Sequence, residues 1–140
     1  MSEFKIVIGE KGKAYFKTLT NDESAFLMNK KIGEKIEGGH FGFKGYEFEI
    51  TGGSDKEGFP MRRDVEGLGR KKIFLTKNSI GTRLNKKGLK IRKSIAGNTI
   101  SQFTSQINFK VLKPGSKHLD EIFGKTNKAE EVKTEETAEA

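Results

Sequence analysis

The sequence predicts an all-β or mainly β protein, with six to seven short strands in a small barrel or highly curved sheet and one or two short helices. The first observation behind this prediction is the glycine content. Seventeen glycines punctuate short runs of β-branched and aromatic residues, which is typical of strands joined by turns. The second is the alternation of apolar and polar residues in the clearest of these runs. With 140 residues, the chain is expected to form one domain.

The first half of the chain is expected to form three strands and a short helix. Residues 4–8 and 14–19 are short runs separated by glycines, and each predicts a strand. Residues 21–30 predict one or two helical turns, because acidic residues stand at the start, where the helix dipole is positive. Residues 32–36 either end this helix or form a short strand. Residues 45–50 alternate strictly and predict a half-buried strand.

The second half is expected to form three further strands followed by a tail. Residues 72–76, 98–102 and 107–112 predict these strands, and the run at 72–76 is too apolar to be fully exposed. From about residue 125, Lys, Glu, Thr and Ala dominate, and such a composition buries too little apolar surface to offset the entropy of ordering. We therefore expect a folded domain at residues 1–124 and a disordered acidic tail at 125–140.

Positive charge is concentrated in one part of the chain. The net charge is +8, yet residues 67–119 contain no Asp or Glu and carry 13 Lys and Arg. Unopposed like charges work against compaction, so a folded segment with such a field is expected to bind a polyanion. Nucleic acid is the expected partner, because its phosphates bind Lys and Arg and release counterions. No membrane partner is expected, because no apolar run approaches the roughly 18 residues of a span.

Residues 52–63, of sequence GGSDKEGFPMRR, directly follow the clearest strand. Glycine permits positive φ angles or close backbone approach, while Ser, Asp and Pro favour turns. Two interpretations stay open. Backbone N–H groups could cradle a phosphate, with charge added by Lys56, Arg62 and Arg63. Alternatively, the segment is an ordered loop whose two apolar residues anchor it in the core. It is not a Walker loop, because no Gly-Lys-Ser/Thr follows at the required spacing.

Residues 86–94, of sequence KKGLKIRKS, form a second basic motif. Lys90 and Arg92 alternate with Leu89 and Ile91, so an extended conformation gives one cationic and one apolar face. Such a segment suits an edge strand or arm laid along a phosphate backbone. The arginine can fork onto phosphate oxygens or stack on a base, whereas the lysines act as point charges. The alternative is a solvated run of charges, which the absence of nearby acids disfavours.

No catalytic site, cofactor or metal site is predicted. The chain has no cysteine, and His40 and His118 lie in unrelated segments without metal-ligand spacing. Ser54 and Asp55 could serve as nucleophile and partner, but a triad also needs a base such as histidine, and the sequence does not place one beside them. No small-molecule substrate is expected. The absence of cysteine also fits a cytosolic protein.

The two motifs, in this order, resemble the S-six-e family of small-subunit ribosomal proteins of archaea and eukaryotes, in its short archaeal form. The residues that carry the resemblance include GGSDKEGFPM at 52–61, Arg92-Lys93-Ser94 and the closing strand at 107–113. The resemblance covers residues 1–119. It implies a barrel-like, mainly β domain without enzymatic activity, located on ribosomes in the cytoplasm. The expected partners are small-subunit ribosomal RNA and neighbouring ribosomal proteins, and the isolated protein is expected to be a monomer.

The resemblance and the residue types together predict the roles of individual side chains. Six residues are expected to maintain the shape of the first loop: Gly52, Gly53, Asp55, Gly58, Phe59 and Pro60. Basic residues of the two motifs and the segment between them are expected to bind RNA. These are Lys56, Arg62, Arg63, Arg70, Lys71, Arg83, Lys86, Lys87, Lys90, Arg92 and Lys93.

Two alternative functions remain open at this point. A free single-stranded RNA-binding module of the OB type would need exposed aromatic residues on a sheet face. Tyr15, Tyr46, Phe41 and Phe43 are the candidates, and their position in the charge-neutral half disfavours this function. An RNA-processing enzyme would need clustered carboxylates, histidine or a cofactor motif, and the basic half offers none of these.

Overall fold

The described part of the protein has seven strands, with short helical segments between and after them. The computed structural model describes residues 3–123, so the predicted disordered tail at 125–140 lies outside the described residues. Within residues 3–123, no helix is long and apolar enough to cross a membrane. The helical segments are α1 (Asn21–Leu27), the 3-10 turn η1 (Gly38–Phe41) and a helical turn at 119–123. The strands are β1 (Lys5–Glu10), β2 (Lys13–Thr18), β3 (Lys35–Glu37), β4 (Glu47–Asp55), β5 (Arg70–Leu75), β6 (Ile91–Ala96) and β7 (Thr104–Lys113).

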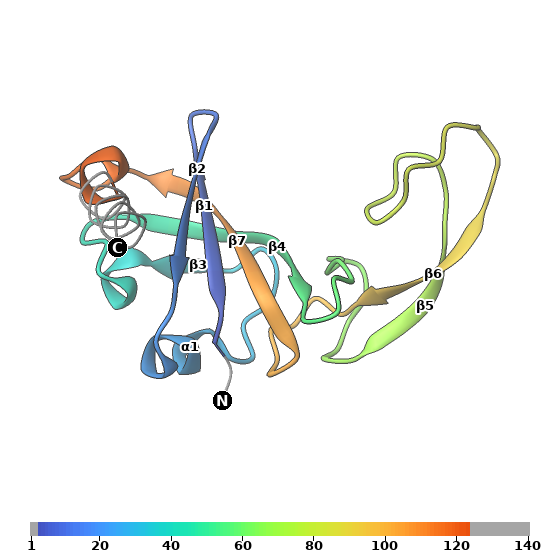
Figure 1. The fold of residues 1–140 in the computed structure, drawn as a ribbon, viewed down its shortest axis with the longest axis horizontal. Coiled ribbons are helices and arrows are strands. Elements are labelled where there is room, and N and C mark those ends of the chain that lie inside the picture. The colour runs from blue at the N-terminus through green and yellow to red at the C-terminus, as the bar shows by residue number, and fades with distance from the viewer. Residues whose placement is uncertain (1–2, 124–140) are drawn as a thin grey trace, which may run out of the picture.

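Five strands form one open sheet, and the other two form a separate ribbon (Figure 1). The sheet has the order β2-β1-β7-β4-β3, in which β1 runs parallel to β7 and the other neighbours are antiparallel. The mainly β class is confirmed. The predicted barrel is not confirmed, because the edge strands β2 and β3 of this described sheet do not pair and close it. Strands β5 and β6 pair with each other instead of extending the sheet.

The main core lies on one face of the five-stranded sheet. Alternate residues of the three central strands β1, β7 and β4 are buried there, and the register places Phe109 of β7 beside Ile8 of β1 and Ile50 of β4. The predicted alternation at residues 45–50 is confirmed, since Tyr46 and Phe48 are also buried. The helical segments contribute further core residues, among them Leu27, Phe41 and Leu119. Burial of this face stabilises the part of the molecule to which the ribbon is attached.

The strand predicted at residues 98–102 is wrong, because this segment is a loop between β6 and β7. Its one apolar residue, Ile100, is fully buried in the main core without belonging to a strand. The backbone N–H groups donate to carbonyls of separate segments, from Asn98 to Val65 at 2.7 Å and from Ile100 to Lys30 at 2.8 Å. An isolated bridge from Thr99 is all that resembles strand pairing in this loop.

Helix α1 begins where the sequence predicts and ends earlier. The Glu23 carboxylate accepts a hydrogen bond from the backbone N–H of Thr20 at 2.9 Å, which caps the first turn. The predicted helix at 21–30 stops at Leu27, and Asn29 has a φ of 65°. A left-handed residue of this kind turns the chain away from the helix axis. The Asn29 N–H then donates to the Ile100 carbonyl at 3.0 Å, so tertiary contact replaces the last predicted turn.

The hydroxyl of Tyr15 binds the helical turn at 119–123 and gives a testable titration. Tyr15 donates to the Asp120 carboxylate at 2.5 Å, and Lys13 contacts the same carboxylate at 3.2 Å. The hydrogen bond to Asp120, aided by desolvation, raises the pKa of Tyr15 to about 12. Absorbance at 295 nm should therefore show Tyr15 ionising near this pH, and Asp120→Asn should move the transition toward 10. Tyr15→Phe identifies the transition, and ionisation near pH 10 in the native protein would contradict the assignment.

Candidate nucleic-acid interface

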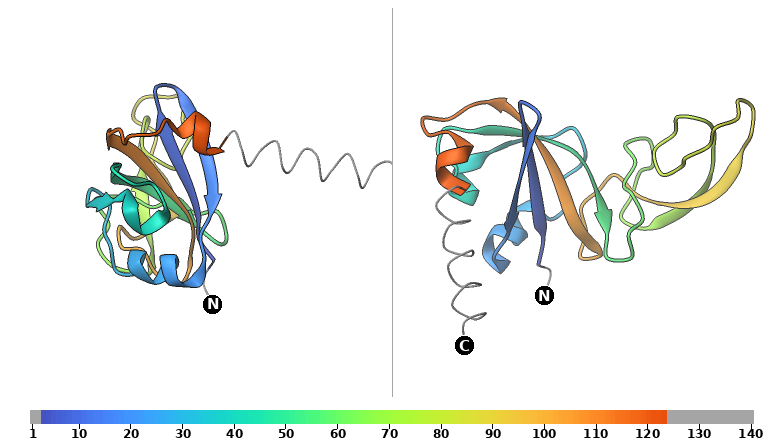
Figure 2. Two further views of the ribbon diagram at one scale, coloured as in Figure 1. Left: turned by 90° about the vertical axis from the view of Figure 1, so that its left-hand side faces the viewer. Right: turned by 45° about the horizontal axis from the view of Figure 1, so that its top comes forward.

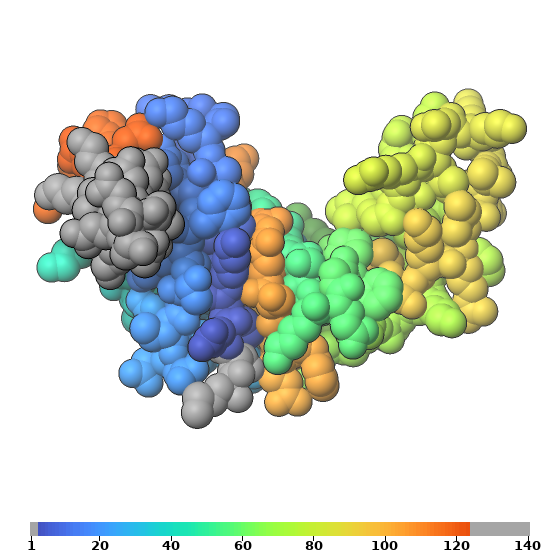
Figure 3. All heavy atoms as spheres, viewed as in Figure 1, coloured from blue at the N-terminus to red at the C-terminus, as the bar shows by residue number. Residues whose placement is uncertain are grey.

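The basic part of the sequence forms a two-stranded projection, here called the basic ribbon (residues 70–96). Strands β5 and β6 pair antiparallel from Arg70 opposite Ala96 to Leu75 opposite Ile91. The connection at 76–90 forms the far end of the projection, which extends away from the five-stranded sheet (Figure 1 and the right-hand view of Figure 2). In the space-filling view the ribbon stands apart from the body of the sheet (Figure 3). Its surface is therefore accessible to a large partner.

The ribbon has one apolar face and one polar face. Residues directly opposite each other in an antiparallel pair share a face. One face carries Leu75 with Ile91 and also Ile95, and the buried Leu75 and Ile95 form a second small core with Val65. This small core explains how a two-stranded ribbon holds its shape outside the main sheet. The opposite face carries Lys72 and Arg92, both exposed.

Nine cations of the ribbon are exposed to solvent without an ionic partner. None of them forms an ion pair with another residue within 3–123. Seven of them are predicted RNA-binding residues, so the structure brings together most of the predicted set on one projection. The predicted alternation at Ile91 and Arg92 is confirmed, whereas Leu89 precedes the strand and is exposed. The nine are Lys71, Lys72, Lys77, Arg83, Lys86, Lys87, Lys90, Arg92 and Lys93.

Three other predicted residues lie between β4 and β5, at the base of the ribbon. Lys56 and Arg63 are exposed, and Arg62 is half-buried. Arg62 forms an ion pair with Asp64 at 3.2 Å. The Arg63 carbonyl accepts a hydrogen bond from the Asn98 side chain at 3.3 Å, which joins this segment to the loop after β6. These cations therefore border the ribbon rather than belong to it.

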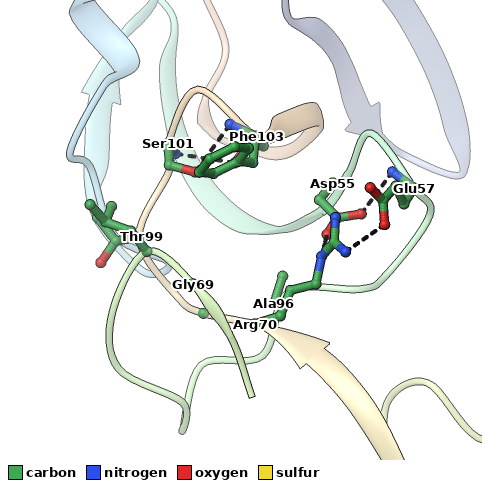
Figure 4. A pocket seen from close by; sticks show the side chains of 11 residues that line it. Asp55, Glu57, Gly69, Arg70, Ala96, Thr99, Ser101 and Phe103 are labelled. Atoms are coloured by element: carbon green, nitrogen blue, oxygen red, sulfur yellow. Dashed lines mark hydrogen bonds and ion pairs between the residues drawn. The ribbon is translucent and has the colours of Figure 1, made fainter. Parts of the chain in front are cut away.

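Arg70 holds the first loop against the base of the ribbon. Its Nε donates to the Asp55 carboxylate at 2.6 Å, and a second guanidinium nitrogen donates to Glu57 (Figure 4). The guanidinium carbon also lies 4.8 Å from the centre of the Phe59 ring, a cation–π contact. Sequence reasoning missed this structural role, because the partners come from a segment 13 and 15 residues away. RNA binding by Arg70 stays a prediction.

The Asp55 carboxylate organises the turn of the GGSDKEGFPM segment. It accepts backbone N–H groups from Glu57 at 2.9 Å and from Phe59 at 3.0 Å. Burial alone would raise the pKa of Asp55, but the hydrogen bonds from Arg70, Phe59 and Glu57 outweigh it and lower the pKa. These two N–H groups are directed at an internal carboxylate rather than outward. This geometry favours the ordered-loop interpretation over a phosphate cradle.

The glycines of this segment act in different ways. Strand β4 continues through Asp55, so Gly52 and Gly53 are strand residues rather than part of a loop. Neither has a positive φ, whereas Gly58 has a φ of 87° and makes the turn. A Cβ on Gly53 would lie 2.3 Å from the carbonyl oxygen of Gln106, so the close approach of β7 requires glycine there. Pro60 and the buried Met61 then lead back toward the ribbon.

A cavity of about 390 Å³ lies between the base of the ribbon and the loop after β6 (Figure 4). Its charged lining groups are Asp55, Glu57 and Arg70, which pair with one another. Phe103 and Leu68 supply exposed apolar surface at its wall. No histidine is among the lining residues, so the described cavity offers no general base of that type.

The side chains that could support the alternative functions are dispersed or buried. Among the stacking candidates, Tyr46, Phe41 and Phe43 are buried in the core, and Tyr15 stacks on Phe123. His40 stacks on the ring of Phe26, with 4.0 Å between ring centres. Within residues 3–123, no three His, Asp or Glu side chains gather in an arrangement that could hold a metal ion.

One exposed aromatic residue of the ribbon was missed by sequence reasoning. Phe74 of β5 is 70% exposed, although the apolar run at 72–76 predicts burial. Leu75 is buried and Ile73 is half-buried, so the prediction holds for its neighbours alone. The alternation of side chains in a strand could have indicated that Phe74 is exposed, because Phe74 must face away from Leu75. The sequence did not show which face is covered.

Comparison with known proteins gives a consistent result. The family model described as ribosomal protein S6e matches residues 3–124. The chain is 42% identical to the small ribosomal subunit protein eS6 of Methanosphaera stadtmanae, over 91% of this chain and 98% of that protein. It is 40% identical to the proteins of the same name from Nanoarchaeum equitans and Methanothermobacter thermautotrophicus. Those matches cover 91% and 86% of this chain, and 96% and 95% of the two relatives. The chain therefore belongs to the S6e family of ribosomal proteins.

Proposed function

We propose that this protein is a structural constituent of the small ribosomal subunit and binds ribosomal RNA through the basic ribbon. The observation that carries the proposal is the group of nine exposed cations on one projection, without ion pairs within residues 3–123, in a chain of the S6e family. The repulsion among these cations falls when phosphate groups neutralise them. The relatives are named as small-subunit proteins, and the same assignment is proposed for this chain.

The ribbon would bind RNA mainly through phosphate contacts. Lys90 directly precedes β6, and Arg92 and Lys93 lie at its start on opposite faces, so the three would contact phosphates around this end of the strand. Arg92 can contact two phosphate oxygens at once, whereas the lysines act as point charges. Phosphate contacts fix position without reading sequence. Specificity would come from the shape of the folded RNA, as is usual for structured RNA.

The remaining parts of the molecule would support this placement. Lys56, Arg62 and Arg63 would extend the contact to the base of the ribbon, and the five-stranded sheet would face neighbouring ribosomal proteins. We place the domain boundary at residues 1–124, with 125–140 as an acidic tail. Bound in this way, the protein would be located on ribosomes in the cytoplasm and would act without catalysing a reaction. The isolated chain would be a monomer.

A triple substitution tests the RNA contact of the ribbon. Lys90→Ala, Arg92→Ala and Lys93→Ala together should leave the fold intact, because all three side chains are exposed. They should weaken binding to purified small-subunit RNA. Each lost phosphate contact flattens the plot of log affinity against log salt by roughly 0.7 to 1, so the slope should fall by about 2 to 3. Binding is measured by filter retention between about 50 and 200 mM salt.

A matched control removes the same charge from the other part of the molecule. Lys31, Lys35 and Lys44 are exposed and form no ion pair within the described residues. Their triple replacement by alanine should leave the salt slope close to that of the native protein. Equal loss in both triple variants would mean that net charge alone acts, and no loss in either would refute the proposed interface. Co-sedimentation with small subunits at high salt tests assembly in the cell.

A further inference from the structure

The polar face of the ribbon carries an aromatic ring that the protein leaves uncovered. Phe74 is the most exposed large apolar side chain among the described residues, at 70%. Its ring takes part in no aromatic stack and no cation–π contact within residues 3–123. Burial of a phenylalanine ring is strongly favourable, and an exposed ring does not make this contribution to stability. A partner that covers the ring would recover this contribution.

The residues around Phe74 indicate the chemistry of that partner. Arg92 lies directly opposite Phe74 in the strand register, and Lys72 lies two residues away on the same face, opposite Ser94. Directly opposite residues have Cβ atoms about 5 Å apart, so the Phe74 ring and the Arg92 guanidinium can contact the same group. Both cations are exposed and unpaired within the described chain. The ring is thus bordered by positive charge.

We propose that Phe74 and Arg92 form a binding site for one unpaired RNA base, a proposal that rests on the proposed function. A nucleotide combines a flat π-face with a flanking phosphate, and this site combines an aromatic ring with two cations. Stacking on an aromatic side chain requires a base outside a helix, because the faces of paired bases are covered by their neighbours. The ligand is therefore a nucleotide in a loop, bulge or single strand. Lys72 and Arg92 would bind its phosphates.

The three other exposed phenylalanines of the described chain lack these features, and one of them, Phe26, stacks on His40. Phe16 of β2 is 58% exposed, but the ammonium group of Lys5 lies 5.0 Å from the centre of its ring. It also belongs to the charge-neutral half of the chain. Phe103 lines the cavity that contains Asp55 and Glu57, and this negative charge opposes phosphate. Phe16 is therefore a suitable control for a general effect of removing an exposed aromatic ring.

The test measures the affinity of the full chain for purified small-subunit RNA. Phe74→Ala should lower affinity by about 5- to 150-fold, the range for loss of one base–aromatic stack. Phe74→Tyr should retain binding, because tyrosine also stacks, while Phe74→Leu should lose most of it. The salt slope should be unchanged in Phe74→Ala and should flatten by roughly 0.7 in Arg92→Ala. Phe16→Ala should bind as the native protein does.

A fluorescent probe tests stacking directly. A single-stranded RNA of twelve nucleotides with a central 2-aminopurine should lose fluorescence when the native protein binds, and a duplex of the same sequence should not. The loss should be absent in Phe74→Ala and present in Phe74→Tyr. Native-like affinity of Phe74→Ala for small-subunit RNA would overturn the inference, as would retained binding by Phe74→Leu.

The remaining outcomes separate this inference from the proposed function. If Phe74→Ala binds RNA normally but fails to assemble into small subunits, the ring contacts a neighbouring protein and the base-stacking site is refuted. If the triple lysine and arginine variant loses RNA binding while Phe74→Ala does not, the proposed function stands and this inference fails. If neither substitution alters RNA binding, both are refuted.

Discussion

Gly97→Ala is expected to lower the free energy of unfolding by about 3 kcal/mol, because a methyl group has no space at this position. A Cβ on Gly97 would lie 1.9 Å from the carbonyl oxygen of Gly67 and 3.3 Å from that of Gly69. Both obstacles are backbone atoms, so a rotamer change cannot remove the clash. The chain at 67–69 would have to move away from the end of β6.

That movement would break the hydrogen bonds that join the ribbon to its base. The Gly97 N–H donates to the Gly69 carbonyl at 3.1 Å, and the neighbouring Asn98 N–H donates to Val65 at 2.7 Å. Val65 belongs to the small core of the ribbon, so a shift there would also disturb the packing against Leu75 and Ile95. We therefore expect loss of stability and a changed position of the ribbon relative to the sheet.

Gly69→Ala is the matched control for this prediction. A Cβ on Gly69 would have no heavy atom within 4 Å, and its φ does not lie in the left-handed region. Its effect should stay within about 0.5 kcal/mol. Urea unfolding followed by circular dichroism measures both variants. Equal stability of Gly97→Ala and Gly69→Ala would show that the chain at 67–69 relaxes easily and that the contact does not constrain the ribbon.

The parts of the fold that depend on local pattern were predictable from the sequence. The alternation of apolar and polar residues at 45–50 predicts β4, because the polarity of each side chain indicates whether that residue is buried. The acid-free segment at 67–119 indicates a cationic surface, and ten of its 13 cations gather on the ribbon, because strand pairing brings 70–75 beside 91–96. The net charge of a segment does not depend on how the segment folds. A segment with many cations and no acids is therefore cationic whatever the order of its strands.

The parts that depend on partners distant in the sequence were not predictable. Residues 98–102 are predicted to form a strand, but they form a loop whose Ile100 is buried in the main core. Arg70 is predicted to bind RNA, and its carboxylate partners Asp55 and Glu57 become visible only in the folded structure, where β5 lies beside the end of β4. Phe74 follows the same logic, because which face of a strand is covered depends on the rest of the molecule. The barrel prediction was not confirmed for the same reason, because which strands pair with each other depends on residues far apart in the sequence.

Asp55→Ala is expected to lower the free energy of unfolding by about 3 kcal/mol, toward the lower end for breaking a buried ion pair. The Asp55 side chain is almost fully buried, whereas Arg70 is 36% exposed, and this exposure reduces the electrostatic contribution. The substitution removes the acceptor for two backbone N–H groups and leaves Arg70 with Glu57 alone. Asp55→Asn should cost less, because its amide oxygen can still accept from the backbone.

The pH dependence of stability tests whether the charge of Asp55 is responsible. The folded state lowers the pKa of this carboxyl below its ordinary value near 3.8. Below pH 4 the unfolded chain therefore binds more protons than the folded protein, and stability falls as the pH drops through the folded pKa. The stability difference between the native protein and Asp55→Asn should be fully present above about pH 5 and should shrink on acidification.

An exposed carboxylate provides the control for that measurement. Asp64 is 73% exposed and pairs with Arg62 at 3.2 Å, so Asp64→Asn removes the same charge from a solvated ion pair. It should alter stability by less than about 1 kcal/mol. If Asp55→Asn behaves like Asp64→Asn at every pH, the Asp55–Arg70 contact does not hold the loop to the ribbon. If the stability difference between the native protein and Asp55→Asn is present above about pH 5 and shrinks on acidification, the Asp55–Arg70 ion pair fixes the base from which the ribbon extends.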